Sequence, residues 1–325
     1  MRPGSVAGPL LKLRRPAAEW GDILLRHLGP IASITALGLA LLTGASAHAA
    51  PVPTHADRRP FQGLGTWVDG YDFSRELVAA PAVTAASVQS MKDRGVRTIW
   101  LQAAKQSAAT PDALLSPHRL GAILTTAHAK GLRVVAWCLP TFQDPAADWR
   151  HLAAMVEFTR AGQHFDAYGV DIEDTRVAAD IRNRRLVAPS QRLRRYTAKP
   201  VSAIVLPPVL TEIIHPGYWG GSFPWQSLKS SYDVWVPMGY YSAYRSFPRW
   251  RDAATSTAED LRRVRRHLGN VPVAYAGGLA GESSGADYDG FARAARAAGA
   301  LGNSAYDYAS TPSWAWSHLR TGAPG

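Results

Sequence analysis

The feature that most constrains the fold is a strand-like run of residues that recurs eight times after residue 60. Each run is short and apolar, β-branched or aromatic, and a polar or Gly/Pro-rich loop and an alanine-rich helical segment follow it. Successive runs start 31 to 39 residues apart, the length of one strand, one crossover helix and the return. The predicted strands are 63–70, 97–104, 133–140, 167–174, 200–208, 232–241, 271–280 and 302–310.

The segments between these runs carry the residues that begin and end helices. Segments 81–95 and 116–131 each finish on a glycine, which is favoured just after a helix C-terminus. Segment 255–269 starts with Ser, Thr and acidic residues and ends in Arg and His, which complements the helix dipole. Segment 283–299 has the same form, so all four are predicted helices.

Eight strand–helix units in about 250 residues predict an α/β fold, a closed (β/α)8 TIM barrel that forms a single domain over residues 61–320. The main alternative is an open doubly wound sheet, which usually has a glycine-rich phosphate loop after its first strand. Here Asp69-Gly70-Tyr71-Asp72-Phe73 follows the first run and has no such pattern. The barrel is therefore favoured.

The N-terminal 49 residues resemble an export signal. A basic region is followed by the apolar run 31–42 and by small residues that end in Ala47-His48-Ala49, an A-x-A cleavage pattern. We interpret 1–49 as a signal peptide, 50–60 as a linker and 321–325 as a tail. The apolar run is short for a membrane span, although a retained anchor is an alternative. We expect a bacterial protein that is secreted or held at the cell wall, without stable membrane insertion after signal removal.

Composition excludes several classes of protein. With 46% hydrophobic residues among 325, the chain can build a large core, and one cysteine, Cys138, excludes a disulfide scaffold. We expect Cys138 in the core, and no His or Cys spacing predicts a metal or other cofactor.

The formal net charge is +11. The most basic stretch, Arg182 to Lys199, is interpreted as a solvent-exposed helix face with its flanking loop. Only Tyr196 interrupts it, so no nucleic-acid partner is predicted.

In such a barrel, functional groups lie at the carboxyl ends of the strands. At the fourth strand, Asp171 and Glu173 are two residues apart and therefore point to the same side. Gly169 is expected to share that face and to leave room beneath them. Two neighbouring carboxyls repel one another, so one should hold a proton at neutral pH and act as a general acid. Asp174 points the other way and is expected to cap the next helix. The structural alternative is that the acidic pair binds arginines of the barrel or caps the next helix.

Aromatic and polar residues at the other strand ends suit a sugar, whose C–H faces stack on aromatic rings while its hydroxyls bind carboxylates and amides. Tyr240 is expected to donate a hydrogen bond to the reacting sugar, with packing as the alternative. Segment 209–230 is expected to form a cleft wall. The remaining predicted substrate-binding residues are Trp67, Asp69, Gln102, Trp137, Tyr241, Tyr306 and Asp307.

Two short segments of the chain, at the fourth and sixth predicted strands, resemble motifs of the family 18 chitinase-like glycoside hydrolases. That family carries D-x-x-D-x-D-x-E on its fourth strand, and this chain has Asp166-Ala-Tyr-Gly169-Val-Asp171-Ile-Glu173. The M-x-Y-D of its sixth strand corresponds to Met238-Gly-Tyr240-Tyr241. The resemblance implies Glu173 as general acid, Asp171 as the group that holds a substrate acetamido group acting as nucleophile, and Tyr240 as its orienting partner. The pair on strand four and the aromatic last strand are also similar to family 25 lysozymes.

The sequence thus predicts a secreted glycoside hydrolase that cleaves an N-acetylated amino-sugar polymer, either chitin-like or peptidoglycan. Three departures from the family 18 pattern favour an alternative, a non-catalytic glycan-binding barrel of the cell wall. The middle acid is Gly169, the acid after Tyr240 is Tyr241, and the third strand lacks S-x-G-G. A further alternative is a wall-attached scaffold that uses the positive charge. In each case the expected partner is a polysaccharide or oligosaccharide.

Overall fold

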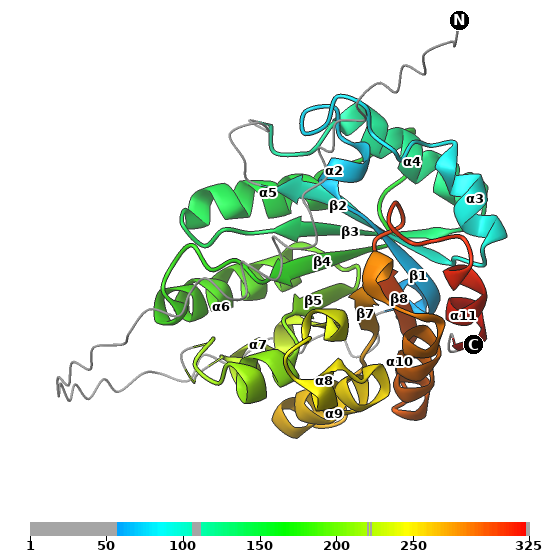
Figure 1. The fold of residues 1–325 in the computed structure, drawn as a ribbon. Coiled ribbons are helices and arrows are strands. Elements are labelled where there is room, and N and C mark those ends of the chain that lie inside the picture. The colour runs from blue at the N-terminus through cyan, green and yellow to red at the C-terminus, as the bar shows by residue number, and fades with distance from the viewer. Residues whose placement is uncertain (1–56, 106–111, 220, 222, 323–325) are drawn as a thin grey trace, which may run out of the picture. The chain divides into compact units, whose positions relative to one another are not determined.

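The computed structural model describes residues 57–105, 112–219, 221 and 223–322. The predicted signal peptide, most of the linker and the last three residues lie outside them. Eight parallel strands pair in sequence order, and β1 pairs with both β2 and β8 to close the barrel (Figure 1). The strands are β1 (Gly63–Val68), β2 (Thr98–Lys105), β3 (Arg133–Leu139), β4 (Ala167–Ile172), β5 (Val201–Val205), β6 (Val234–Gly239), β7 (Tyr275–Leu279) and β8 (Gly302–Tyr306).

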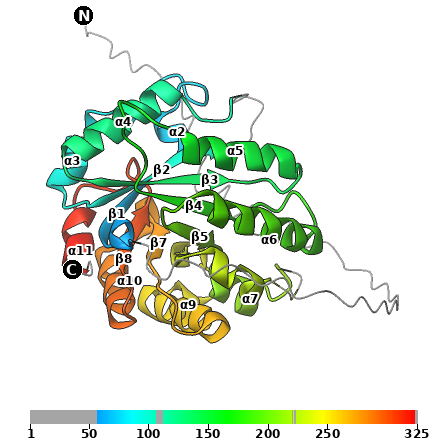
Figure 2. The same cartoon turned by 180° about the vertical axis from the view of Figure 1, so that it is seen from behind.

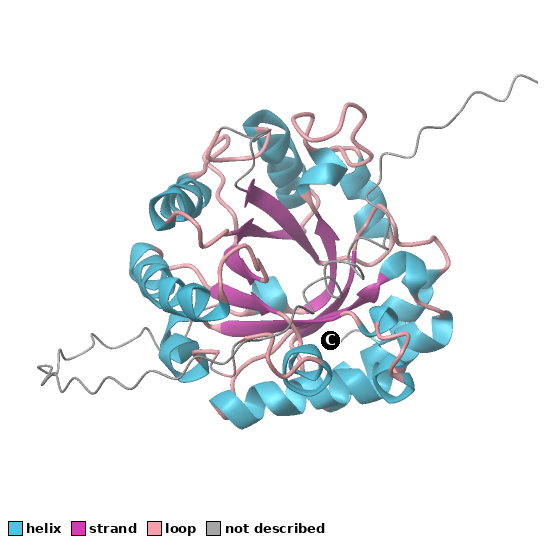
Figure 3. Cartoon of the chain, turned by 60° about the vertical axis from the view of Figure 1, so that its left-hand side comes forward, coloured by secondary structure: helices cyan, strands magenta, loops and turns pink. Residues whose placement is uncertain are grey.

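Helices surround the strands, as Figures 2 and 3 show from two further directions. The predicted (β/α)8 barrel is confirmed, and each predicted strand overlaps an observed one, with the observed strands shorter at one or both ends in most cases. The helices are α2 (Gly70–Phe73), α3 (Ser87–Asp93), α4 (Pro117–Ala129), α5 (Pro145–Glu157), α6 (Ala179–Tyr196), α7 (Trp225–Leu228), α8 (Pro248–Arg251), α9 (Ala253–Leu268), α10 (Gly285–Ala297) and α11 (Ala315–Gly322). Within the described residues, no helix combines the length and apolarity needed to cross a membrane.

The described residues also form several short helical turns. A 3₁₀ turn at Arg59–Phe61 precedes β1 and buries Phe61 at the predicted start of the domain. A π-helical turn, Val209–Ile214, follows β5. The other 3₁₀ turns are Lys229–Ser231, Tyr241–Ala243 and Ala280–Glu282.

Alternating side chains of the strands build two packed layers. Inside the barrel, Trp67 stacks on Trp100 with ring centroids 4.6 Å apart, and its indole N–H donates to Ser304 Oγ at 2.8 Å. Outside it, Trp235 packs against Trp225 of α7 at 5.4 Å. Cys138 is buried, which confirms its predicted place in the core. The barrel interior is therefore filled by side chains, as in other barrels of eight strands.

Gly169 faces this interior but does not leave it empty, which corrects the expectation of open space beneath the acidic pair. A Cβ atom at Gly169 would lie 2.8 Å from Ile204 Cδ1 and 3.3 Å from Trp137 Cβ. Those contacts are closer than packed carbon atoms tolerate. The glycine thus allows neighbouring side chains to fill the barrel below Asp171.

Candidate functional site

The acidic pair lies at the carboxyl end of β4. Asp171 is the penultimate residue of the strand and is only 4% exposed, while Glu173 follows the strand directly and is partly buried. β4 lies between β3 and β5, with Asp171 opposite Ile204. The strand thus delivers both residues to the end of the barrel where functional groups of this fold gather.

Burial governs the protonation of this pair. It is the main cause that raises the pKa of Asp171 well above its usual range, and the charges of Glu173 and Asp174 raise it further. The pKa of Glu173 rises to about 7, again through burial first and the charge of Asp174 second, while Lys105 opposes both shifts. The sequence predicted raised pKa values from mutual repulsion, but desolvation is the larger cause. Asp171 Oδ1 has no hydrogen-bond partner among the described residues.

Tyr240 lies within electrostatic range of carboxylates at the ends of several strands. It follows β6, its hydroxyl donates to Met238 Sδ at 3.3 Å, and its ring meets Tyr306 edge-on at 6.3 Å. Burial raises the pKa of its phenol well above the usual value, and four carboxylates from three strand ends add to that shift. These are Glu173, Asp171, Asp307 and Asp69. Tyr240 is thus within electrostatic range of the acidic pair.

Asp69 connects the first and last strands. Its Oδ1 caps α2 by accepting the N–H groups of Tyr71 at 2.8 Å and Asp72 at 3.1 Å. Its Oδ2 accepts the Tyr306 hydroxyl at 2.5 Å. The predicted residues Asp69 and Tyr306 therefore form one hydrogen-bonded unit between β1 and β8.

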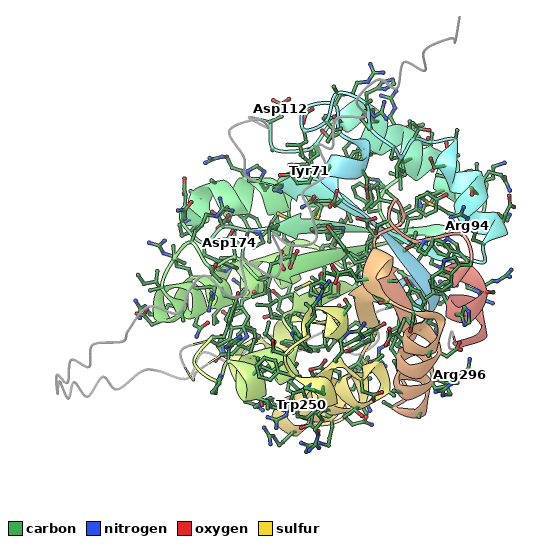
Figure 4. All side chains as sticks on the ribbon, in the orientation of Figure 1. Tyr71, Arg94, Asp112, Asp174, Trp250 and Arg296 are labelled. Atoms are coloured by element: carbon green, nitrogen blue, oxygen red, sulfur yellow. The ribbon has the colours of Figure 1, made fainter. Side chains whose placement is uncertain are left out.

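Lys105 is not among the predicted site residues, although it ends β2 beside Gln102. Its ammonium lies 4.5 Å from the centre of the Tyr71 ring and donates to the Tyr71 hydroxyl at 3.3 Å. Figure 4 shows Tyr71 on α2 and Asp174 beyond the end of β4. Because Lys105 lowers the pKa of both Asp171 and Glu173, it acts on the acidic pair from the end of β2, two strands away from β4.

Three predicted substrate-binding residues belong to the packed interior. Trp67 is buried between Trp100 and Ser304, and Trp137 is buried 5.8 Å edge-on from Trp67, with no partner for its indole N–H among the described residues. Gln102 is also buried, and its Oε1 accepts the Gly70 N–H at 2.8 Å. Through these contacts Trp67 helps to fill the barrel interior, and Gln102 holds the backbone at the start of α2.

Tyr241 is placed away from the acidic pair, which corrects its predicted contact with substrate. It is fully buried, and its ring packs 6.1 Å from that of Phe291 on α10, outside the barrel. Both tyrosines follow β6, which ends at Gly239, and Tyr241 opens the 3₁₀ turn Tyr241–Ala243, so the turn and not the strand sets its direction.

The other two acids near strand ends make local hydrogen bonds. Asp307 Oδ1 accepts the Ser310 N–H at 2.7 Å, and its carbonyl oxygen accepts the Thr311 hydroxyl at 2.6 Å. Asp174 accepts the Arg176 N–H at 2.9 Å and pairs with the Arg176 guanidinium at 2.5 Å. Since α6 begins only at Ala179, Asp174 shapes the loop and does not cap that helix as predicted.

Two cavities lie elsewhere. One is at the amino end of the barrel beside Phe61, Trp100 and Asn303, and the other lies between β4 and α6 beside Val170 and Leu186. No predicted site residue lines either one. Within the described ranges, no group of three or more His, Cys, Asp or Glu residues could hold a metal ion.

Comparison with known proteins adds information on the fold alone. No family model and no curated protein matches the chain. Among solved structures, it is similar to a chitinase from Chromobacterium violaceum, with a TM-score of 0.56 and 12% identity over 80% of this chain and 98% of that one. It is also similar to an endo-1,4-β-mannanase from Rhizomucor miehei, with a TM-score of 0.59 and 9% identity over 81% and 94%.

A spore cortex-lytic enzyme from Bacillus cereus has a TM-score of 0.55 and 8% identity over 79% of this chain and 73% of that one. At these identities the likeness establishes a shared barrel architecture. Function has to be argued from the side chains, because this barrel supports many unrelated chemistries.

Proposed function

We propose that this protein hydrolyses glycosidic bonds, with Glu173 as the general acid. The observation that carries the proposal is the acidic pair at the carboxyl end of β4, where Asp171 is buried with an unpartnered Oδ1 and burial raises the pKa of the adjacent Glu173 to about 7. A general acid works best when its pKa lies near the working pH, because it is then both protonated and ready to donate. The fold likeness to glycoside hydrolases supports this assignment.

The chemistry requires a proton for the leaving oxygen and support for the cation that develops on the sugar ring. Glu173 supplies the proton. By the resemblance to family 18, the Asp171 carboxyl holds a substrate acetamido group as that group attacks the anomeric carbon, and Tyr240 orients it. The unpartnered Oδ1 of Asp171 suits this role, because a buried oxygen without a partner gains most from a ligand's hydrogen bond.

The proposed substrate is an N-acetylated amino-sugar polymer, either chitin-like or peptidoglycan. The motif at β4 and the Met238–Tyr240 pair at the end of β6 favour it, since that combination serves acetamido sugars in family 18. We further propose that residues 1–49 export the protein, which would then meet its polymer outside the cell or in the cell wall.

A second candidate function is glycan binding without turnover. The position of Tyr241 favours it, because the residue that replaces the acid of the sixth-strand motif packs against Phe291. Because Gly169 also stands where that pattern has an acid, the site has two acids fewer than the family 18 pattern. In this case exposed aromatic rings, such as Tyr71 (37% exposed) and Trp314 (49% exposed), would provide the affinity.

The deciding experiment compares wild type with Glu173→Gln on chitin oligomers, peptidoglycan and β-1,4-mannan. We expect hydrolysis to fall about 10²- to 10⁴-fold on the preferred substrate, the usual contribution of a positioned general acid. Thermal stability should stay unchanged, since no hydrogen bond from the described residues acts on the Glu173 carboxyl and Gln has nearly the same shape.

Asp180→Asn is the matched control, because Asp180 lies on α6 with its side chain 64% exposed and should leave hydrolysis unchanged. Full activity in Glu173→Gln would contradict the proposal. Glycan binding without turnover in the wild type, lost in Tyr71→Ala or Trp314→Ala but kept in Glu173→Gln, would establish the second function.

A further inference from the structure

Arg182 on α6 is a buried cation, although the stretch 182–199 was predicted to be exposed. Arg182 is only 1% exposed, and no carboxylate among the described residues forms an ion pair with its guanidinium. Burial lowers the pKa of its guanidinium to about 10. An unpaired buried charge is costly, and an apolar side chain of similar volume would normally pack there more favourably. Its presence therefore calls for a task other than packing.

The guanidinium of Arg182 joins two loops. Its Nη1 donates to the carbonyl oxygen of Asp174 at 3.2 Å, and its Nη2 donates to the carbonyl oxygen of Tyr218 at 3.1 Å. It also lies over the Trp219 ring, 3.9 Å from its centre. The next residue of the helix, Asn183, donates to the carbonyl oxygen of Trp219 at 3.1 Å. Helix α6 thus fastens the segment after β5 to the loop after β4.

This connection reaches the acidic pair. Asp174 directly follows Glu173 in the chain, so Arg182 holds the backbone next to the proposed acid. The half-buried Tyr218 lies within electrostatic range of Glu173, whose carboxylate helps to raise the pKa of the Tyr218 phenol. Two loops that Arg182 ties together therefore bring a tyrosine and the acid near one another.

We propose that Arg182 is a positioning residue that holds Tyr218 beside Glu173 and so limits the access of solvent to the Glu173 carboxyl. This inference rests on the proposed function for its catalytic meaning. Arginine suits the task because its planar fork binds two carbonyl oxygens in fixed directions while its face stacks on an indole. Lysine carries the same charge on a point-like ammonium without that fork.

The test is an NMR titration of the Glu173 side-chain carboxyl in ¹³C-glutamate-labelled protein, with Glu173→Gln to assign its resonance. In Arg182→Met we expect the pKa of Glu173 to fall by about one unit, a tenfold change in proton affinity, because water then reaches the carboxyl. The sign is diagnostic. Loss of a nearby positive charge alone would raise that pKa, whereas loss of cover lowers it.

Arg184→Met is the matched control, because Arg184 lies on the same helix with its side chain 69% exposed and should leave the titration unchanged. Arg182→Lys should give an intermediate fall, and it keeps the inference testable if the methionine variant does not fold. In a Tyr218→Ala background, Arg182→Met should add nothing further, since residues that act through one another are not additive.

An unchanged or raised pKa of Glu173 in folded Arg182→Met, or in Arg182→Lys if only that variant folds, would overturn the inference. The titration needs no substrate. If no glycan is hydrolysed, the proposed function fails while the positioning by Arg182 can still be measured. If hydrolysis depends on Glu173 but its titration ignores Arg182, only the inference fails.

Discussion

Two buried acids of this protein have similar pKa values and different surroundings. Burial raises the pKa of Glu173 to about 7 at the carboxyl end of β4, and it raises the pKa of Asp260 on α9 to about 7 as well. Asp260 Oδ1 accepts the Val209 N–H at 2.8 Å, and its Oδ2 accepts the Tyr275 hydroxyl at 2.8 Å. By contrast, Asp171 beside Glu173 has an oxygen without any partner in the described part of the chain.

The difference teaches that a raised pKa does not by itself mark a catalytic acid. Asp260 lies outside the barrel, where it joins α9 to β7 and to the turn after β5. Each of its carboxylate oxygens accepts a hydrogen bond, and these two bonds explain why an acid is buried there. Burial also raises the pKa values of both acids at the end of β4, but there Asp171 Oδ1 has no hydrogen-bond partner among the described residues. Asp171 Oδ1 is the only carboxylate oxygen among the buried side-chain atoms without a partner in the described residues, so it is the acid that calls for a ligand.

The comparison predicts its largest effect at Asp260. Asp260→Ala removes the acceptor of two buried donors, each of which costs about 1–3 kcal/mol when left unpaired. We expect a loss of about 2–4 kcal/mol in the free energy of unfolding, measured by urea denaturation. Asp260→Asn is the conservative control, since its amide can still bond to both Val209 and Tyr275. Equal stability of the alanine variant and wild type would show that Asp260 has no structural task.

The opposite outcome is expected at Asp171. Asp171→Asn removes a buried acid whose Oδ1 has no partner among the described residues, so unfolding should change by less than about 1 kcal/mol. Hydrolysis should nevertheless fall by about 10²-fold or more, since the variant loses the carboxyl that is proposed to hold the substrate acetamido group. Steady-state kinetics and urea denaturation on the same samples check both. A large loss of stability with full activity would make Asp171 equivalent to Asp260.

Much of the fold was predictable because strand and helix signals are local. Each run that became β1 to β8 carries its own apolar composition and is followed by its own turn residues. The position of Asp171 and Glu173 also follows from local alternation along β4. Gly169 was misinterpreted because a missing side chain says nothing about neighbours, and here Ile204 and Trp137 from adjacent strands fill the space.

The errors at Arg182 and Tyr241 have a shared physical cause. Both depend on which helix or loop packs outside the barrel, and that contact joins residues far apart in the chain. Arg182 is buried because the segment that carries Tyr218 and Trp219 folds over it. Tyr241 is buried because α10 brings Phe291 to it. The sequence around Arg182 or Tyr241 indicates which local structure forms there. It does not show which distant residues will cover the side chain.

The finest test of the comparison uses two opposite charges near Glu173. If Glu173 is the general acid, hydrolysis should decline as the pH rises through its pKa of about 7. The charge of Asp174 raises that pKa, so Asp174→Asn should move the decline to lower pH. Lys105 lowers it, so Lys105→Met should move the decline to higher pH. We expect shifts of about half a pH unit, since both groups are partly solvated.

Full pH–rate profiles of kcat/KM measure these shifts, because they report the pKa values of groups in the free enzyme. Asp260→Asn should leave the profile in place, since Asp260 is not among the groups that shift the pKa of Glu173. Shifts of the same sign in Asp174→Asn and Lys105→Met would mean that a different group titrates. A shift caused by Asp260→Asn instead would mean that the structural acid, and not the acid at the end of β4, controls the rate.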